Sequence, residues 1–514
     1  MEQRRIPSKQ GNMFIGAGLS FVGRVLSSLL GYFSLIITVK IVGSFDFGLY
    51  NIALSIIAFV NILSVFGFEN SLLRYIPLWK QKGKQYLEQK LNLSIAFVTL
   101  LSFVFTLLLI FASFPIGDLY NSFKLKYALI IMGLSITFNT FIVVSRAINQ
   151  AFFKYRRAIV PEDFVRPIST FILLVILWTY SYFTKEQLNF LLIPVLYFFS
   201  TILSSIYAIK TLRLTLKEEE LKFSIKLHNF KLERELIQYT FYTFSITLIL
   251  QFSYTFTIFT LGMILSPTEV GYLSLSLKTV SFVSFILIAV NKVFGPRIAD
   301  LYAKNQINEL HRLYKETVRW ILTFGTPICL CLVLESKNIL HFFGTDFVKA
   351  SVSLIILSVG EFVNIAVGSV GYILMMSGNA ALNLKVNIFS LIVTIILTIV
   401  LTPILGVNGS AIAISLGVIL TNLLNLIFVK KMIGIFPYSK NQYIIVASIV
   451  LNVFFHWFIS NIFIYNIIVS LISIFIIHLV IVVVFGLNKI EKRMILNFLI
   501  KKFKVARLNK YDNA

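Results

Sequence analysis

Three charged side chains lie deep inside long apolar runs, and they are the residues best placed to do chemistry. Arg24 and Lys278 each sit more than two helical turns into such a run, and Glu361 sits near the middle of another. Charges at that depth are costly in a bilayer and usually face protein or water. The two cations could hold an anionic headgroup in a central cavity, and Glu361 could pair with a cation or bind a coupling ion. The structural alternative is that the three residues form buried pairs with one another.

Two further cations, Arg146 and Arg166, lie within a turn or two of the ends of their apolar runs. Long basic side chains at such positions usually extend to the headgroup layer, which makes these two secondary candidates for substrate binding. Glu162 and Asp163 follow Pro161, where acids complement the dipole at the start of a helix. We expect a structural role for those two acids.

An aromatic-rich run from residue 239 to 265 offers polar or polar-tipped side chains at Tyr242, Gln251 and Tyr254. Sugars stack on aromatic rings, so these three residues are candidates for contact with a glycan. Lipid packing and interfacial belts account for most aromatic residues in such runs. Both interpretations stay open.

Several kinds of chemistry find no support in the sequence. There is no phosphate-binding GxxxxGK[ST] motif, and the five histidines are scattered without metal-ligand spacing. Cys329 and Cys331 lie two residues apart in one apolar run, as ordinary core residues do. We therefore predict no metal site, no cofactor and no enzyme activity.

The elements that position these residues are membrane-spanning helices. Of the 514 residues, 58% are hydrophobic and 13% are charged, and apolar runs of roughly 20 residues match the thickness of a bilayer. We predict an all-α integral membrane protein with fourteen spans. They lie at 15–42, 50–73, 91–114, 127–152, 164–183, 188–209, 239–265, 270–293, 318–334, 352–376, 384–405, 410–429, 443–463 and 467–485.

The spans group into two six-helix lobes and two extra helices. The predicted N-lobe is 1–210 and the C-lobe is 239–430, joined by a cytoplasmic linker at 211–238. Spans thirteen and fourteen occupy 431–487. A basic cytoplasmic tail follows at 488–514, which suits an amphipathic helix at the membrane surface.

The distribution of positive charge orients the helices. Of the 46 Lys and Arg residues, 36 fall on the side that holds both termini, 6 fall on the opposite side and 4 lie deeper in spans. The positive side faces the cytoplasm, so both termini are predicted to be cytoplasmic. The net charge of +24 is dispersed over many loops, which favours anionic lipids as partners and argues against nucleic acid.

An internal repeat relates residues 46–74 to residues 269–297. Asp46, Gly48 and Arg74 of the first copy match Glu269, Gly271 and Arg297 of the second; where the copies differ, Ser55 becomes Lys278 and Glu69 becomes Lys292. Repeats of this kind are common in transporters that work by alternating access. We predict that Glu69 and Lys292 form a gate that pairs when the cytoplasmic side is closed.

Three stretches resemble the polysaccharide transporter (Wzx-like) branch of the multidrug/oligosaccharidyl-lipid/polysaccharide flippase superfamily. They are GLYNIALSIIAFVNILSVFGFENSLLRYIP, SRAINQAFFKYRR and MSGNAALNLKVNIFSLIVTIILTIVLTPILGVNGSAIA. The resemblance covers roughly residues 12–480. It implies two lobes in a V shape, with spans one, two, seven and eight lining a cleft, and cleft cations that hold a pyrophosphate. It also implies transport of a lipid-linked oligosaccharide from the inner to the outer leaflet.

The charged residues also favour a negatively charged substrate, because Arg24 and Lys278 suit a polyprenyl diphosphate better than a cationic drug. We therefore expect a flippase in the inner membrane of a prokaryote, serving O-antigen or similar surface glycans. Its expected partners are the lipid-linked oligosaccharide, anionic lipids, a Na⁺ or H⁺ gradient, and a glycan polymerase or glycosyltransferases. An ion-coupled multidrug exporter of the same fold, or a membrane enzyme of glycan assembly, remain alternatives.

Overall fold

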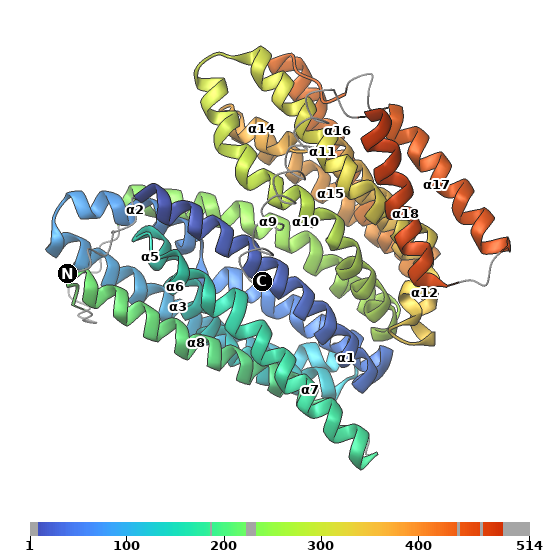
Figure 1. Cartoon of the computed structure of the whole chain (residues 1–514). Coiled ribbons are helices and arrows are strands. Elements are labelled where there is room, and N and C mark those ends of the chain that lie inside the picture. Colours follow the sequence, from blue (N-terminus) through green and yellow to red (C-terminus); the bar gives the residue numbers. More distant parts are fainter. Residues whose placement is uncertain (1–8, 186–187, 223–232, 439–442, 463–465, 487–514) are drawn as a thin grey trace, which may run out of the picture. The chain divides into compact units, whose positions relative to one another are not determined.

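The structure is a computed structural model that describes residues 9–185, 188–222, 233–438, 443–462 and 466–486. Every element in these ranges is a helix (Figure 1). The predicted basic tail at 488–514 and the middle of the predicted linker at 211–238 lie outside the described residues. The contacts of the chain divide it into two compact units. Unit 1 holds residues 1–275, 341–350 and 387–413, and unit 2 holds the remainder.

The first helix, α1 (Lys9–Val65), contains two of the predicted spans. A straight helix of its 57 residues would be about 85 Å long, far more than one bilayer crossing. Gly43 breaks it with a φ of 76°, a backbone conformation that glycine adopts without a steric penalty. One residue therefore separates spans one and two, where the sequence suggested a joint of several residues.

The chain from α2 to α9 contains the next five spans. The predicted boundaries agree with the structure to within a few residues in the apolar parts, and the helices continue past them into polar sequence. The elements are α2 (Phe68–Gln81), α3 (Lys84–Leu119), α4 (Phe123–Gly133), α5 (Ser135–Ala151), α6 (Tyr155–Val160), the π-helix η1 (Pro161–Val165), α7 (Arg166–Thr184), α8 (Leu192–Glu218) and α9 (Arg234–Ile264).

The later helices follow the same plan with two departures. The ninth span begins at Ile307, eleven residues before the predicted start, because an amphipathic segment continues its helix outward. The tenth span is broken at Gly368, where φ is 73°. The elements are α10 (Pro267–Ala303), α11 (Ile307–Leu334), α12 (Ser336–His341), the 3₁₀ helix η2 (Thr345–Ala350), α13 (Ser351–Val367), α14 (Val370–Met376), α15 (Ala380–Leu405), α16 (Val407–Ile433), α17 (Tyr443–Ile462), α18 (Ile467–Ile481) and the π-helix η4 (Val482–Gly486).

The number of spans agrees with the sequence prediction. Within the described residues, eleven helical stretches are long and apolar enough to cross a membrane, and the first of them contains two predicted spans. The helix α7 and the shorter apolar helix α17 occupy the positions of the remaining two. The prediction of an all-α, multi-pass membrane protein is confirmed. The lobe boundaries and the cytoplasmic placement of the termini stay predictions.

Two glycines of the repeat meet within unit 1. A Cβ on Gly48 would lie 1.6 Å from the carbonyl oxygen of Pro267, and a Cβ on Gly271 would lie 2.7 Å from that of Ser44. Helices approach this closely only where neither carries a side chain, as at the small-residue crossings of membrane proteins. The crossing of α1 and α10 therefore requires glycine at both positions.

A contact between an acid and a lysine in the first copy of the repeat has a counterpart in the second copy, at nearly the same offset in sequence. Asp46 accepts hydrogen bonds from the Lys124 ammonium at 2.8 and 2.9 Å. In the second copy, Lys349 interacts electrostatically with Glu269. The offset between the acids is 223 residues and that between the lysines is 225, so the repeat extends beyond the stretch that the sequence revealed.

A buried polar cluster connects α17 and α18 to the end of α11. Glu335, which is fully buried, accepts hydrogen bonds from the Ser470 hydroxyl and from the Asn338 amide, the latter at 2.7 Å. The Nδ1 atom of His456 lies 3.6 Å from the same carboxyl group. These contacts join α12, α17 and α18 to the end of α11 at one point. They fix the last two spans to unit 2, in which all four residues lie.

Candidate functional site

Intramembrane charges of unit 1 gather around Arg146 on α5. Its guanidinium donates a hydrogen bond to Glu162 in η1, and the exposed fractions of the two side chains are 24% and 33%. Glu69 on α2 lies within electrostatic reach of both residues. The Arg146 side chain is therefore paired with Glu162 of the same chain. The sequence had favoured its extension to the lipid headgroups.

Arg166, the first residue of α7, has its own set of partners. Its guanidinium donates to the Asn139 side-chain oxygen at 3.1 Å and to the Tyr197 hydroxyl at 2.8 Å, and it lies 5.0 Å from the centre of the Tyr197 ring. Glu162 is again within electrostatic reach. Three helices thus hold this cation in a fixed position, and it too does not extend to lipid headgroups.

The π-helix η1 positions the acid that these two arginines share. The Ser204 hydroxyl on α8 donates to the Pro161 carbonyl at 2.6 Å, and the Arg166 N–H donates to the same carbonyl across the wide turn. On the other side, a Cβ at Gly23 would meet the Phe164 ring at 2.6 Å and the Cβ of Asp163 at 3.3 Å. The backbone of α1 therefore lies directly against η1.

Arg24 follows Gly23 in the chain, so its backbone lies beside the acids of η1. Its side chain is outside the part of the structure that is described, as is that of Lys292. Substrate binding by Arg24 stays a prediction. So does the gate between Glu69 and Lys292, although the charged neighbours of Glu69 shown here are Arg146 and Glu162.

Glu361 forms a separate polar site within unit 2. On α13, its Oε1 atom accepts hydrogen bonds from the Ser284 hydroxyl of α10 and, at 2.8 Å, from the Asn364 amide. Lys278 lies on α10 six residues before Ser284, and its side chain is half-buried. A carboxyl group with neutral donors around it is suited to binding a proton or a small cation.

The aromatic candidates lie on α9, in unit 1. Gln251 donates to the Thr255 hydroxyl at 3.2 Å, and that hydroxyl donates to the Ser55 carbonyl of α1 at 3.1 Å. Tyr254 is half-buried, whereas Tyr242 is 41% exposed. Gln251 is thus connected to the position that corresponds to Lys278 in the repeat, and contact with a glycan stays a prediction.

Of the predicted site residues, the structure brings together Glu69, Arg146 and Arg166, and Glu162 is the residue that links them. Sequence reasoning gave Glu162 only a role at a helix start. Asn139 and Tyr197 were not singled out at all. A usable signal was present, because Glu162 and Asp163 lie between Arg146 and Arg166 in the chain, and acids and arginines next to apolar spans tend to pair. No group of three or more metal-ligating side chains occurs among the described residues.

The cluster of Glu69, Arg146, Glu162 and Arg166 can bind an anion if an arginine exchanges its carboxylate partner for that anion. A guanidinium already held in position by neutral acceptors and an aromatic ring can form a bidentate contact with a phosphate without losing much side-chain entropy. The acids Glu69 and Glu162 neutralise the arginines when no anion is bound, so that the cluster does not leave isolated charges in the membrane.

Comparison with known proteins decides the family. The model of the family described as "polysaccharide biosynthesis protein" matches residues 15–302, more than half of the chain. The chain belongs to this family. A second model, MatE, matches residues 244–400. None of the curated proteins matches the chain in sequence.

Similar solved structures show the fold of this chain. The lipid II flippase MurJ, in an inward closed conformation, matches with a TM-score of 0.74 at 18% identity over 93% of this chain and 99% of that one. An inward-facing MATE family multidrug resistance transporter of the MOP superfamily matches with 0.62 at 14% identity, over 80% and 98%. A MOP superfamily transporter from Pyrococcus furiosus matches with 0.58 at 13% identity, over 83% and 96%. The protein therefore has the MOP transporter fold.

Proposed function

We propose that this protein is a flippase that moves a polyprenyl-diphosphate-linked oligosaccharide from the cytoplasmic to the outer leaflet of a prokaryotic inner membrane, by alternating access. The observation that carries the proposal is the half-buried cluster of Arg146 and Arg166, each held by partners within the chain, in a member of a polysaccharide biosynthesis family. Likeness to a lipid II flippase supports it, because that cargo is also a lipid-linked glycan.

The chemistry of such a substrate matches the cluster. A diphosphate is a multiply charged anion, and its contacts with arginine strengthen where water is excluded. The polyprenyl chain can remain in the bilayer while the headgroup crosses. In this proposal Arg166 binds the diphosphate, Arg146 exchanges Glu162 for it, and Arg24 contributes further positive charge. Substrate contact by Lys278 stays a prediction.

A transport assay in proteoliposomes tests the proposal. The vesicles contain a fluorescent polyprenyl-diphosphate oligosaccharide, and its transfer between leaflets is measured as accessibility to a glycosidase added outside. Arg166→Gln should reduce transfer at least tenfold, because a bidentate contact is lost. Arg156→Gln is the matched control, since Arg156 is an arginine of the same segment that the cluster does not use. Equal transfer by both variants would refute the role of Arg166, and no transfer by the native protein would refute the flippase.

A second function is favoured by the Glu361 site. The MatE match spans this residue, and a carboxyl group held by Ser284 and Asn364 suits an ion-coupled exporter of small molecules. Efflux of a cationic dye from the same vesicles, driven by a Na⁺ or H⁺ gradient, would favour this function over the first. The dye should compete with the lipid-linked glycan only if one cavity serves both.

A glycan polymerase and glycosyltransferases are the proposed partners in surface glycan assembly. Their products would be the lipid-linked substrate or its polymer. Deletion of the gene should then leave the lipid-linked glycan in the cytoplasmic leaflet. Normal surface display of every glycan in such cells would count against the assignment to this pathway.

A further inference from the structure

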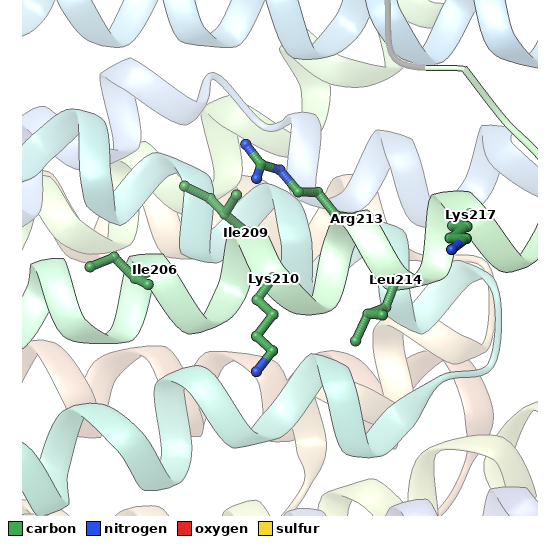
Figure 2. A pocket seen from close by; sticks show the side chains of 6 residues that line it. All are labelled: Ile206, Ile209, Lys210, Arg213, Leu214 and Lys217. Carbon is green, nitrogen blue, oxygen red and sulfur yellow. The ribbon is translucent and has the colours of Figure 1, made fainter.

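A basic and apolar patch covers the outer surface of α8 near its C-terminal end. A cavity of about 380 Å³ lies on it, and Figure 2 shows the six lining side chains along successive turns of this one helix. In this view Lys210 and Arg213 reach to opposite sides of the ribbon. We call this set the α8 patch; it consists of Ile206, Ile209, Lys210, Arg213, Leu214 and Lys217.

The opposite face of α8 is packed inside unit 1. Ser204, Ala208 and Thr211 are buried there, and the Ser204 hydroxyl donates to the carbonyl of Pro161. In contrast, Ile206 is 59% exposed and Leu214 is 44% exposed. On a membrane-spanning helix, apolar side chains with such exposure face lipid. The α8 patch therefore faces the surrounding bilayer.

The length of α8 places the cations at the level of the headgroups. Its 27 residues extend about 40 Å, and the hydrocarbon core is about 30 Å thick, or roughly 20 helical residues. Counted from Leu192, the core ends close to Lys210 and Arg213. Ile206 and Ile209 then lie beside acyl chains, and Lys217 lies among the headgroups.

No acid of the described residues forms a salt bridge with Lys210, Arg213 or Lys217. Three acids do follow directly, but each is engaged by a cation from another element. Lys154 and Arg157 bind Glu218, Lys80 binds Glu219 at 2.6 Å, and Lys84 binds Glu220 at 2.8 Å.

The contact between Lys84 and Glu220 also affects the pKa of Glu220. The hydrogen bond from Lys84 holds the pKa of Glu220 below its usual value. Because the neighbouring acids have other partners, the α8 patch keeps three positive charges for an anion from outside the chain.

We propose that the α8 patch binds an anionic phospholipid. The long side chains of Lys210 and Arg213 turn toward Lys217 to hold the phosphate, and an acyl chain lies along Ile206 and Ile209. All lining residues come from the outer surface of one helix, so the occupant is a resident lipid of the surrounding leaflet and not cargo in transit. The proposal does not depend on the transport function proposed above.

Native mass spectrometry of the full-length protein, delipidated and titrated with phosphatidylglycerol or phosphatidylcholine, tests the site. Phosphatidylglycerol should bind the native protein more tightly. Lys210→Gln/Lys217→Gln should weaken that binding about tenfold, because each cation near an anionic headgroup contributes several-fold. Adding Arg213→Gln should remove the preference for phosphatidylglycerol. Circular dichroism and gel filtration establish that each variant is folded.

The matched control is Lys304→Gln/Arg312→Gln, which removes two charges that are already paired with Asp300 and Glu316. It should bind phosphatidylglycerol as the native protein does. Equal weakening in both double variants would overturn the proposal, since net charge alone would explain it. Unchanged binding in Lys210→Gln/Lys217→Gln would also overturn it. So would displacement of phosphatidylglycerol by millimolar inorganic phosphate, or a preference of the patch for a polyprenyl diphosphate.

Discussion

Gly48 of α1 and Gly271 of α10 lie in backbone contact, and they occupy equivalent positions in the internal repeat. Each glycine lies close to the backbone that precedes the other. Gly48 faces the carbonyl of Pro267, and Gly271 faces that of Ser44. The repeat therefore reflects a structural need, because each copy supplies one half of the same helix crossing.

Gly48→Ala should destabilise the protein by about 3 kcal/mol, because a methyl group cannot occupy a site 1.6 Å from a carbonyl oxygen unless the helices separate. Thermal unfolding in detergent measures the effect. Gly31→Ala is the control within the same helix, since nothing lies within 4 Å of a Cβ there. Similar melting temperatures for the two variants would mean that the crossing is not tightly packed.

The coupling between Arg146 and Glu162 can be measured with a double-mutant cycle. Arg146→Gln and Glu162→Gln should each destabilise the protein, and the double variant should be more stable than the sum of the two effects predicts by about 1 kcal/mol. The modest value reflects partial exposure of both side chains. A cycle on the exposed pair Arg312–Glu316 should show no measurable coupling. Additive effects at Arg146 and Glu162 would show that the pair contributes nothing.

Ser284 should tune ion binding if Glu361 is a coupling site. Ser284→Ala removes a hydroxyl that donates to the carboxyl group, and we expect the ion concentration for half-maximal transport to change about tenfold. Glu361→Gln should abolish the dependence on the ion altogether. Ser281→Ala serves as the control, because that hydroxyl donates to the backbone of Lys278. Transport by Glu361→Gln that still follows the gradient would exclude this residue.

Glu335→Ala should loosen α17 and α18 from α11. The substitution leaves the Ser470 hydroxyl and the Asn338 amide without their acceptor, at a cost of about 2–4 kcal/mol. Cys331 reports the change, because its thiol is buried 4.0 Å from the Leu471 carbonyl. In a Cys329→Ser background, a maleimide should label Cys331 much faster after Glu335→Ala.

The control for this experiment is Lys337→Ala on the neighbouring α12, an exposed position. It should leave the labelling rate unchanged. Glu335→Gln should give an intermediate rate, because an amide oxygen can still accept from Ser470. Equal labelling of Cys331 in all variants would show that the cluster does not hold these helices in place.

The sequence was sufficient to predict the membrane-spanning helices and their number, because the thickness of a bilayer sets the length of each apolar run. It was insufficient where a helix leaves the membrane. The start of α11 at Ile307 lies in polar sequence, where no such constraint acts. The sequence indicated that Glu162 and Asp163 would find cations, but which arginine pairs with Glu162 could not be read, because Glu162 lies within the wide turn of η1.

The internal repeat shows the same limit of prediction from sequence. Equivalence of Gly48 and Gly271 could be read from the 223-residue offset, but their contact could not. The offset also predicts roughly where to look for the partners of Asp46 and Glu269, because Lys124 and Lys349 lie 225 residues apart, two more than the acids. Sequence spacing thus identifies corresponding residues, and only the fold shows which of them touch.

The break at Gly43 also constrains how the gene can change. Only four residues separate Gly43 from Gly48, and they are helical. Inserting or deleting one residue between them would rotate all of the following segment by about 100° about its axis. A different residue, with a side chain, would then face Pro267. Natural relatives should therefore vary in amino acid between these two glycines but not in the length of the interval.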